Sequence, residues 1–314
     1  MDYQKLGNTG IEVSRLCFGT LTIGPLQKDL PLCKGVGLLE LAFDLGVNFL
    51  DTAELYGTYP YVREALRIKP NAVVCTKSYA YDQETAENSF QKAVEGIGRE
   101  YIDIFLLHEQ ESEHTVRGHY AAIEYFLKKK EQGYIGALGL STHHIAGVYG
   151  ANRYPEMEVV FPLINKTGIG IADGSAEEMI LACQTAHTLG KGLFAMKPLG
   201  GGHLLPRRKE ALQYLLRQPI FHSVAVGMQS EIEVKYNCAL FSGEEPSDEW
   251  EQALSRIKRR LLIQDWCEGC GACVARCKSK ALRLEEGKTV VDYNRCAVCG
   301  YCAAVCPQFC IKVI

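Results

Sequence analysis

Eight short apolar segments recur between residues 15 and 228, and each is followed by a longer amphipathic stretch. The repeat takes roughly 24 to 33 residues, which is the length that a strand, a loop and a crossover helix need. Eight such units predict an α/β fold, a (β/α)8 TIM barrel. One of the helical stretches is bounded by Thr115 and Gly133, residues typical of helix caps. The predicted strands are residues 15–19, 48–52, 72–77, 102–108, 137–141, 159–165, 193–198 and 223–228.

The segments on either side of this repeat differ from it. The opening stretch YQKLGNTGIEVS has a GNTG turn between two short alternating runs, which predicts a hairpin that closes the floor of the barrel. After Phe241, the stretch SGEEPSDEW is typical of a linker, and we expect a charged helix over residues 248–262. The sequence thus predicts a barrel over residues 1–241, a linker and helix over 242–264, and a small α+β domain over 265–314.

Composition limits the class of partners. Apolar residues make up 47% and charged residues 23% of the 314 residues, and the formal net charge is −3. These values are ordinary for a globular protein and give no indication of a nucleic-acid partner. The start of the chain lacks the basic and apolar regions of a signal peptide, and no apolar run reaches the ~20 residues that cross a bilayer. We therefore expect a cytoplasmic protein without a membrane-inserted segment.

Ionisable side chains stand at the C-terminal ends of three consecutive predicted strands, where TIM barrels place their chemistry. Asp51, Lys77 and His108 end these strands, and Tyr56 follows the first of them. Carbonyl reduction needs a proton donor for the developing alkoxide, so we assign Tyr56 this role and expect Lys77 to lower its pKa. Asp51 would hold the ammonium group, and a neutral His108 would orient the substrate oxygen. Each residue alone has an ordinary structural explanation, but the four together favour catalysis.

The segments around these residues resemble the aldo-keto reductase family. NFLDTAELYG, VVCTKS and DIFLLHE are similar to its signature segments in order and spacing, and the resemblance covers about residues 1–240. On this resemblance the family's catalytic tetrad falls on Asp51, Tyr56, Lys77 and His108. The resemblance implies hydride transfer between NADPH or NADH and the carbonyl carbon of a small substrate.

The positions that would contact the dinucleotide match the family less closely. Thr142 replaces the asparagine of a Ser-Asn pair, Met196 replaces the aromatic residue that stacks on nicotinamide, and Lys197 replaces a small hydroxyl residue. Glu233 stands where NADPH-dependent members carry a basic residue, and a carboxylate there would repel a 2′-phosphate. These departures leave open whether the cofactor is NADPH, NADH or a flavin. The resemblance assigns to the cofactor Ser141, Thr142, Asn165, Met196, Lys197, Pro198, Leu199, Gly200, Ser230 and Asn237.

Two features near these positions are less informative. The run Gly200 to Gly202 is equally consistent with a flexible loop and with a phosphate cradle. His143 and His144 follow a strand, and we interpret them as loop residues without a catalytic role.

Eight of the 14 cysteines form two groups near the C-terminus. The first group, which ends at Cys277, has the spacing C-x2-C-x2-C-x3-C, and the second, which ends at Cys306, repeats it. Two copies of this spacing predict [4Fe-4S] clusters, because three nearby thiolates hold one face of a cubane and the fourth reaches the other. Two zinc knuckles are the alternative, which the triplet spacing disfavours. The stretch between the groups predicts two short strands.

This region resembles a bacterial two-cluster ferredoxin over roughly fifty residues. Lys278 replaces the proline that usually follows the first group, which removes no ligand. Cys310 lies outside the spacing, and we expect a buried thiol. On this resemblance cluster one is held by Cys267, Cys270, Cys273 and Cys306, and cluster two by Cys296, Cys299, Cys302 and Cys277.

Two functions remain compatible with the sequence. In the first, the barrel reduces an aldehyde or ketone with NAD(P)H, and the ferredoxin-like domain exchanges single electrons with a donor or acceptor protein. In the second, the chain is a redox sensor or electron-transfer adaptor whose barrel is not a nicotinamide-dependent reductase and could bind a flavin. The intact tetrad favours the first function.

Overall fold

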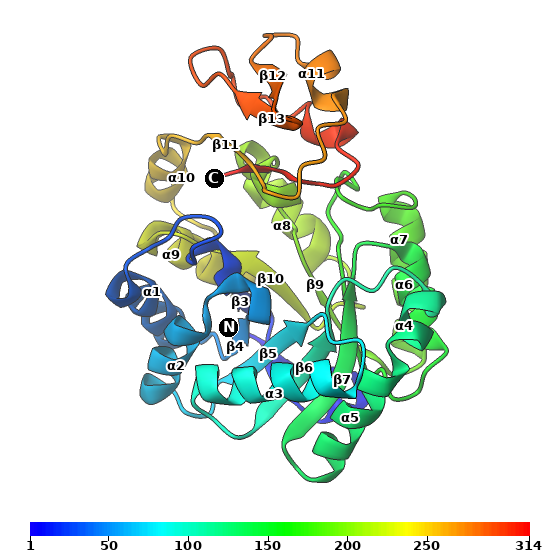
Figure 1. Ribbon diagram of the computed structural model, residues 1–314. Helices are drawn as coiled ribbons and strands as arrows, with labels where there is room; N and C mark the ends of the chain where they lie inside the picture. Colours follow the sequence, from blue (N-terminus) through cyan, green and yellow to red (C-terminus); the bar gives the residue numbers. More distant parts are fainter.

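The computed structural model describes residues 1–314, and eight parallel strands in it close into a barrel (Figure 1). The strand order is β10-β3-β4-β5-β6-β7-β8-β9, and β10 pairs with both β9 and β3, so the sheet has no free edge. The predicted TIM barrel is therefore confirmed. The barrel strands are β3 Leu16–Gly19, β4 Phe49–Asp51, β5 Val73–Ser78, β6 Ile102–Leu107, β7 Ile135–Thr142, β8 Val159–Pro162, β9 Gly192–Ala195 and β10 Ser223–Gly227.

Helices surround the barrel on its outer side (Figure 1). No helix is long and apolar enough to cross a membrane. Eleven α-helices are present, of which the last two follow the barrel. They are α1 Leu32–Asp44, α2 Tyr59–Ile68, α3 Gln83–Ile97, α4 Glu113–Gly118, α5 Tyr120–Glu131, α6 Ile145–Asn152, α7 Ala176–Thr188, α8 Arg208–Leu216, α9 Glu231–Phe241, α10 Asp248–Ser255 and α11 Ala272–Arg276.

Local capping explains where these helices start, and it corrects one prediction. The helix expected to begin at Thr115 begins after Ser112, because the Thr115 hydroxyl reaches back and accepts the Ser112 backbone N–H at 3.1 Å. A threonine three residues into a helix is thus part of a capping box rather than the cap itself. The same stretch is also divided at His119 into α4 and α5, so it is not one continuous helix.

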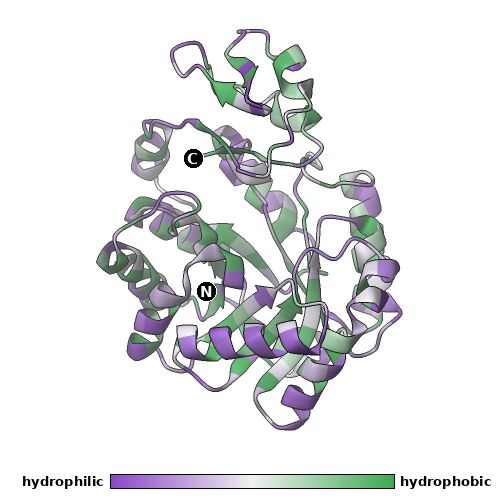
Figure 2. Cartoon of the chain, viewed as in Figure 1, coloured by the Kyte–Doolittle hydropathy of each residue, from purple (hydrophilic) through white to green (hydrophobic).

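Two hydrophobic layers hold the barrel together. The larger, of 57 buried residues, lies between the strands and the helices, and the smaller fills the barrel interior. Inside the barrel, Phe161 stacks on Phe194 with ring centroids 3.8 Å apart, and Phe194 lies 5.0 Å from Phe49. Figure 2 shows the barrel strands largely in the hydrophobic colour, with hydrophilic residues on the outer helices. The interior is therefore packed with side chains rather than hollow.

A hairpin closes one end of this interior, as predicted. Strands β1 Tyr3–Lys5 and β2 Glu12–Ser14 pair antiparallel. Leu6 and Val13 from this hairpin belong to the interior cluster. The hairpin thus seals the floor at the N-terminal ends of the strands, which leaves the opposite face for chemistry.

The last part of the chain, residues 261–314, forms a small unit that we call the cysteine-rich unit. Its strands form two antiparallel pairs: β11 Leu261–Ile263 with β14 Ile311–Val313, and β12 Leu282–Glu285 with β13 Lys288–Val291. The predicted pair of strands between the cysteine groups is confirmed. The helix predicted to reach residue 262 ends at Ser255 instead, because Leu261–Ile263 extends to pair with the end of the chain.

The cysteine-rich unit lies against the C-terminal face of the barrel, at the top of Figure 1. The contact is made by β14 on the short 3-10 turn η4 Gly200–Gly202, which follows β9. His203 Nε2 lies 2.9 Å from the backbone oxygen of Ile311. Phe309 joins the interior cluster of the barrel, so the cysteine-rich unit closes the end of the interior that the hairpin leaves open.

Candidate functional site

A buried ion pair lies at the C-terminal face of the barrel, where β4 and β5 end. Asp51 is the last residue of β4, and Lys77 is the penultimate residue of β5. The Lys77 Nζ atom is 2.6 Å from Asp51 Oδ1 and also donates to the backbone oxygen of Thr52 at 2.7 Å. Lys77 is 1% exposed and Asp51 is 5% exposed, so water does not reach this pair.

The two other predicted residues lie beside this pair. Tyr56 is at the end of the 3-10 turn η3 Glu54–Tyr56, and Lys77 Nζ is 4.9 Å from the centroid of its ring. His108 follows β6, and its ring meets Tyr56 edge-on with centroids 5.8 Å apart. The structure therefore brings all four predicted residues together at one rim.

Burial has the largest effect on the acidity of these groups. Burial raises the pKa of Tyr56 above its ordinary value, and nearby Lys77 opposes this rise without cancelling it. Lys77 thus acts on the pKa of Tyr56 in the expected direction. The expected net lowering of this pKa is wrong, because burial has the larger effect. Burial alone would lower the pKa of Lys77, but Asp51, Tyr56 and Cys75 together outweigh it and the pKa is raised. Burial and two lysines lower the pKa of His108, which keeps this ring neutral.

The sequence interpretation missed two residues next to His108. Tyr79 stacks on the His108 ring with centroids 4.5 Å apart, and its hydroxyl donates to Glu109 Oε2 at 2.7 Å. The Nδ1 atom of His108 is buried without a hydrogen-bond partner. Tyr79 follows the end of β5, so the rule that identified Lys77 could also have identified Tyr79.

The cysteine-rich unit brings thiols of both sequence groups together. Burial raises the pKa of Cys273, and the neighbouring thiols of Cys306 and Cys267 add to this rise. A hydrogen bond from the Cys310 thiol lowers the pKa of Cys306 to about 6, with the two sulfur atoms 3.4 Å apart. Cys310 is buried, as predicted. Cys306, from the second group, therefore lies near thiols of the first, and the exchange of ligands between the two groups stays a prediction.

Two other cysteines of this unit, Cys302 and Cys277, also have close neighbours, whereas Cys270 and Cys299 are exposed. Burial raises the pKa of Cys302 to about 11, with Cys273 and Cys299 as neighbouring thiols. The backbone N–H of Ala281 donates to Cys277 Sγ at 3.3 Å. No three His, Cys, Asp or Glu side chains are grouped as ligands of one metal ion. A set of thiols with hydrogen bonds to sulfur is the donor set that holds iron-sulfur clusters, so these residues fit such clusters.

Comparison with known proteins agrees with this arrangement. Residues 15–215, more than half of the chain, match the family model described as the aldo/keto reductase family. The chain belongs to the aldo/keto reductase family. Residues 260–307 match the model of a 4Fe-4S dicluster domain, so this oxidoreductase carries an iron-sulfur domain after its barrel.

Curated relatives and solved structures are similar over most of the chain. L-galactose dehydrogenase of Arabidopsis thaliana is 25% identical over 83% of this chain and 94% of its own. The oxidoreductase YqkF of Bacillus subtilis is 22% identical over 81% of this chain and 95% of its own. A solved aldo-keto reductase from Bacillus halodurans, in its holo form, shares the fold with a TM-score of 0.66, 20% identity and coverage of 82% of this chain and 96% of that one.

Most hydroxyl and amide groups that the resemblance assigns to the dinucleotide are used within the chain. Ser141 Oγ accepts the Glu109 N–H at 2.9 Å, and Thr142 Oγ1 accepts the His144 N–H at 2.9 Å. Asn165 Nδ2 donates to the backbone of Ile169 at 2.9 Å, and Ser230 caps α9 by accepting the Glu233 N–H. Asn237 is buried on α9. These groups hold loops and helix ends in place.

The loop after β9 is covered by the cysteine-rich unit. Met196 is 8% exposed and Pro198 is buried, and Lys197 and Leu199 are half-buried. All three glycines of η4 have positive φ values, and a Cβ on Gly202 would overlap the backbone oxygen of Val313. The run of glycines therefore allows β14 to approach, and it is neither a free loop nor an open cradle.

A nicotinamide cofactor fits only one end of this site. The tetrad, with the unpartnered nitrogen of His108, fits the reacting end of the cofactor. The glycines of η4 leave no room for a phosphate group while β14 covers this turn. A dinucleotide bound in the manner of the family would need β14 to move off this turn.

Glu233 does not stand as an uncompensated negative charge. It forms an ion pair with Arg259, which follows α10, and it also accepts the backbone N–H of Gln229 at 2.6 Å. Arg259 therefore offsets the negative charge on which the predicted repulsion of a 2′-phosphate depends, and the choice between NADPH and NADH stays a prediction. Sequence alone gave no signal of this pairing, since the two residues lie in different elements.

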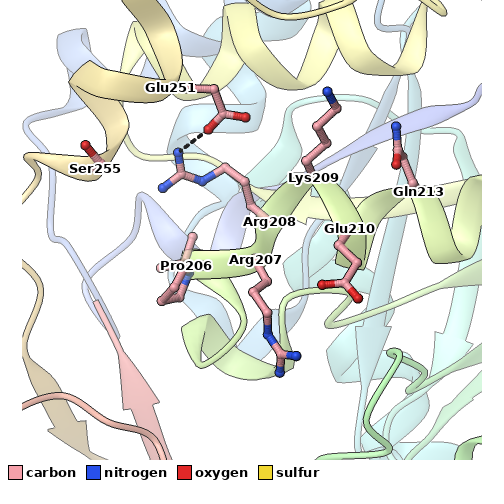
Figure 3. Close-up of a pocket in the computed structure, with 9 residues that line it drawn as sticks. Pro206, Arg207, Arg208, Lys209, Glu210, Gln213, Glu251 and Ser255 are labelled. Atoms are coloured by element: carbon pink, nitrogen blue, oxygen red, sulfur yellow. Dashed lines mark ion pairs between the residues drawn. The ribbon is translucent and has the colours of Figure 1, made fainter. Parts of the chain in front are cut away.

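A separate pocket of about 330 Å³ lies between α8 and α10 (Figure 3). Charged side chains dominate its lining, and Arg208 forms an ion pair with Glu251 across it at 3.6 Å. It contains no member of the tetrad and no residue assigned to the cofactor. The pocket is thus distinct from the site at the barrel rim.

Proposed function

We propose that the chain is a cytoplasmic oxidoreductase whose barrel reduces a small aldehyde or ketone, with Tyr56 as the proton donor. The observation that carries this proposal is the buried Lys77–Asp51 pair beside Tyr56 and a neutral His108. NAD(P)H, when bound, would supply the hydride. Two [4Fe-4S] clusters in the cysteine-rich unit would exchange single electrons with a partner protein.

Each of the four residues would have a separate role in carbonyl reduction. Tyr56 remains protonated at neutral pH because burial raises the pKa of its phenol, so its proton is available to the carbonyl oxygen. Lys77 stabilises the phenolate that this transfer leaves behind, and Asp51 keeps the ammonium group in position. The neutral His108 ring donates one hydrogen bond to the carbonyl oxygen and fixes its orientation.

The test is the variant Tyr56→Phe in cluster-loaded protein prepared without oxygen. We expect kcat/KM for carbonyl reduction to fall by roughly 10²- to 10⁴-fold, the usual contribution of a general acid. Iron and sulfide contents should stay unchanged. Tyr81→Phe is the matched control, because Tyr81 also follows a barrel strand, β5, but is 57% exposed. Unchanged carbonyl reduction by Tyr56→Phe would contradict the proposal.

The electron-transfer part has its own test. We expect protein purified without oxygen to be brown and to contain about eight iron and eight sulfide ions per chain, as two [4Fe-4S] clusters require. Stoichiometric zinc in place of iron would contradict the clusters. A spectroscopic redox titration would then show whether both clusters accept electrons.

The covered η4 turn favours a second candidate function. If β14 stays on η4, the barrel does not take up a dinucleotide and serves as a redox sensor or electron-transfer adaptor. Titration of the cluster-loaded protein with NADPH and NADH separates the two functions. Saturable binding of either nucleotide supports the reductase, and its absence, together with unchanged activity of Tyr56→Phe, supports the adaptor.

A further inference from the structure

Lys197 has an unusual backbone and a well-defined place. It follows β9 with a φ of 57°, a left-handed conformation that residues with a Cβ rarely adopt. Its backbone oxygen accepts the N–H of Gly200 at 2.9 Å and lies 3.4 Å from Asn165 Nδ2. These contacts fix the backbone so that the side chain extends toward the barrel rim. Strained residues of this kind are concentrated at functional sites.

The ammonium group of Lys197 has no carboxylate partner. Its hydrogen-bond partner is Nε2 of a neutral His143, at 2.6 Å. Lys77, the other lysine of the rim, has Asp51 at 2.6 Å. Burial lowers the pKa of Lys197 to about 8, and Lys77 contributes to this fall. Lys197 is therefore a partly desolvated cation that forms no ion pair, although the carboxylates of Glu109 and Asp51 favour its charged form from a distance.

The surroundings of Lys197 place it between the tetrad and the cysteine-rich unit. The charged groups around it are Glu109, Lys77 and Asp51 on the tetrad side and Lys312 of the cysteine-rich unit. Its Nζ atom also lies 5.2 Å from the centroid of the Phe309 ring, which comes from the cysteine-rich unit. His143 is 18% exposed in its side chain, so this position is open in part to solvent, and its Nε2 atom also lies 3.5 Å from Glu109 Oε1.

A second buried lysine, Lys312, has a different set of neighbours. It belongs to β14, donates to the backbone oxygen of Phe309, and also lacks a carboxylate partner. Burial and the nearby charge of Lys197 lower the pKa of Lys312, and the groups that oppose this fall are the thiols of Cys310 and Cys306 as well as Glu109. Lys312 therefore has cysteine thiols among its neighbours, whereas Lys197 has Lys77 and Asp51 of the tetrad. Of these two lysines, Lys197 is therefore the one that we expect to bind a ligand at the tetrad.

We propose that Lys197, together with His143, binds an anionic oxygen group of the substrate, so that the carbonyl compound reduced beside Tyr56 is an oxo acid. This inference rests on the proposed carbonyl reduction. A carboxylate held by Lys197 would place the adjacent carbonyl group near Tyr56 and His108. Phe309 would cover it, so the cysteine-rich unit supplies one wall of the substrate site.

The experiment compares oxo acids with their methyl esters, which keep the carbonyl group and remove the charge. Pyruvate and methyl pyruvate form the first pair, and longer 2-oxo, 3-oxo and aldehyde acids extend the series. We expect the wild-type protein to show a lower KM for at least one acid than for its ester. We expect Lys197→Met to raise that KM by roughly 10- to 100-fold, the usual loss for a hydrogen bond to a charged group.

Three further variants make the comparison specific. Lys197→Arg keeps the charge and should retain the preference for the acid. Lys197→Gly removes the charge and also relieves the positive φ, so it should lose the preference without losing stability. Lys166→Met is the matched control, because Lys166 is an exposed lysine that pairs with Glu210 outside the site. Iron content and melting temperature check that each variant is folded.

The outcomes separate this inference from the proposed function. Equal KM values for every acid and its ester would overturn the inference while leaving carbonyl reduction intact. A Lys197→Met variant that instead raises the KM for NADPH, equally with acids and esters, would assign the anionic group to the cofactor and also overturn it. Calorimetric titration with oxamate, an unreactive mimic of pyruvate, needs no turnover. Oxamate binding that is lost in Lys197→Met would support the anion site. If Tyr56→Phe at the same time left carbonyl reduction unchanged, the anion site would stand and the proposed reductase function would be contradicted.

Discussion

The barrel and the cysteine-rich unit obtain their geometry in different ways. The barrel positions its tetrad by packing, with one core of 57 residues outside the strands and a second of 16 inside. The cysteine-rich unit has a core of eight residues, of which three are cysteines, and its sheets have two strands each. Two-stranded sheets are marginally stable in water without further support. We therefore expect the barrel to be organised before any ligand binds and the cysteine-rich unit to depend on bound iron-sulfur clusters.

The strongest test of this comparison is removal of iron. We expect chelation under oxidising conditions to unfold the cysteine-rich unit and leave the barrel folded, because metal binding supplies most of the folding free energy of small metal-binding domains. Hydrogen exchange should show loss of protection in β12 and β13 and full protection in β5 and β6. Cys302→Ser should lose iron, and Cys33→Ser, at an exposed cysteine outside both groups, should keep it. Persistent protection of β12 and β13 in iron-free protein would contradict the comparison.

Within the barrel, the largest stability effect should come from the ion pair of the tetrad. Lys77→Met leaves the Asp51 carboxylate buried without its partner, so we expect the free energy of unfolding of the barrel to fall by about 3–5 kcal/mol. The double variant Asp51→Leu, Lys77→Met removes both charges and should recover most of this loss. Urea denaturation followed by circular dichroism measures these differences.

A second ion pair provides the control for this measurement. Lys92 pairs with Glu54 at 2.7 Å but is largely exposed, so Lys92→Met should change the free energy of unfolding by less than about 1 kcal/mol. If Lys77→Met costs no more than Lys92→Met, the tetrad is not held by a desolvated ion pair. The positions of Asp51 and Lys77 would then need another explanation.

Sequence reasoning succeeded where the signal is local or periodic. The eight strands follow from a repeat of apolar segments, and Asp51, Lys77 and His108 follow from the rule that chemistry gathers where barrel strands end. The cysteine spacing predicts the 4Fe-4S domain because ligand distances along the chain restrict the metal centre. Each of these patterns is contained in a short stretch of residues.

Sequence reasoning failed where distant segments meet. Arg259 pairs with Glu233, and Phe309 enters the barrel interior, although no local pattern marks either contact. The hydroxyls of Ser141 and Thr142 look available in sequence, but backbone N–H groups of neighbouring loops use them. Contacts of this kind depend on the tertiary arrangement, which outweighs local preference.

Adding a single Cβ atom should weaken the contact between the barrel and the cysteine-rich unit. Gly202 has a φ of 92° and lies against the backbone of Val313. Gly202→Ala should therefore displace β14 from η4 and weaken the docking of the cysteine-rich unit on the barrel by roughly 1–3 kcal/mol. Gly243→Ala is the matched control, because Gly243 also has a positive φ, of 77°, but has open space around it. Hydrogen exchange of β11 and β14 measures docking. If β14 competes with the dinucleotide, Gly202→Ala should also tighten NADPH binding, and Gly243→Ala should not. Equal effects of the two variants would show that backbone strain, not the contact with Val313, is responsible.

The smallest expected effect is on the pH dependence of KM, which distinguishes Lys197 from the groups of the tetrad. Burial keeps the pKa of His108 below its ordinary value and raises that of Tyr56, so neither group should titrate between about pH 6.5 and 10. Burial lowers the pKa of Lys197 to about 8, so its ammonium group is charged below that pH and loses its proton above it. The KM for an oxo acid should therefore rise above pH 8, by up to about tenfold per pH unit, while the KM for its methyl ester stays flat.

The control for this pH profile is Lys197→Met, which should show no inflection near pH 8 with either substrate. Glu109, Lys77 and Asp51 also act on Lys197, and the bound carboxylate stabilises its charged form. The inflection should consequently move to higher pH in the substrate complex, which kcat reports, than in the free protein, which kcat/KM reports. An inflection of the same size with the ester would assign the titration to a group that acts on the carbonyl itself, and the division between a preorganised tetrad and a separate anion site would not hold.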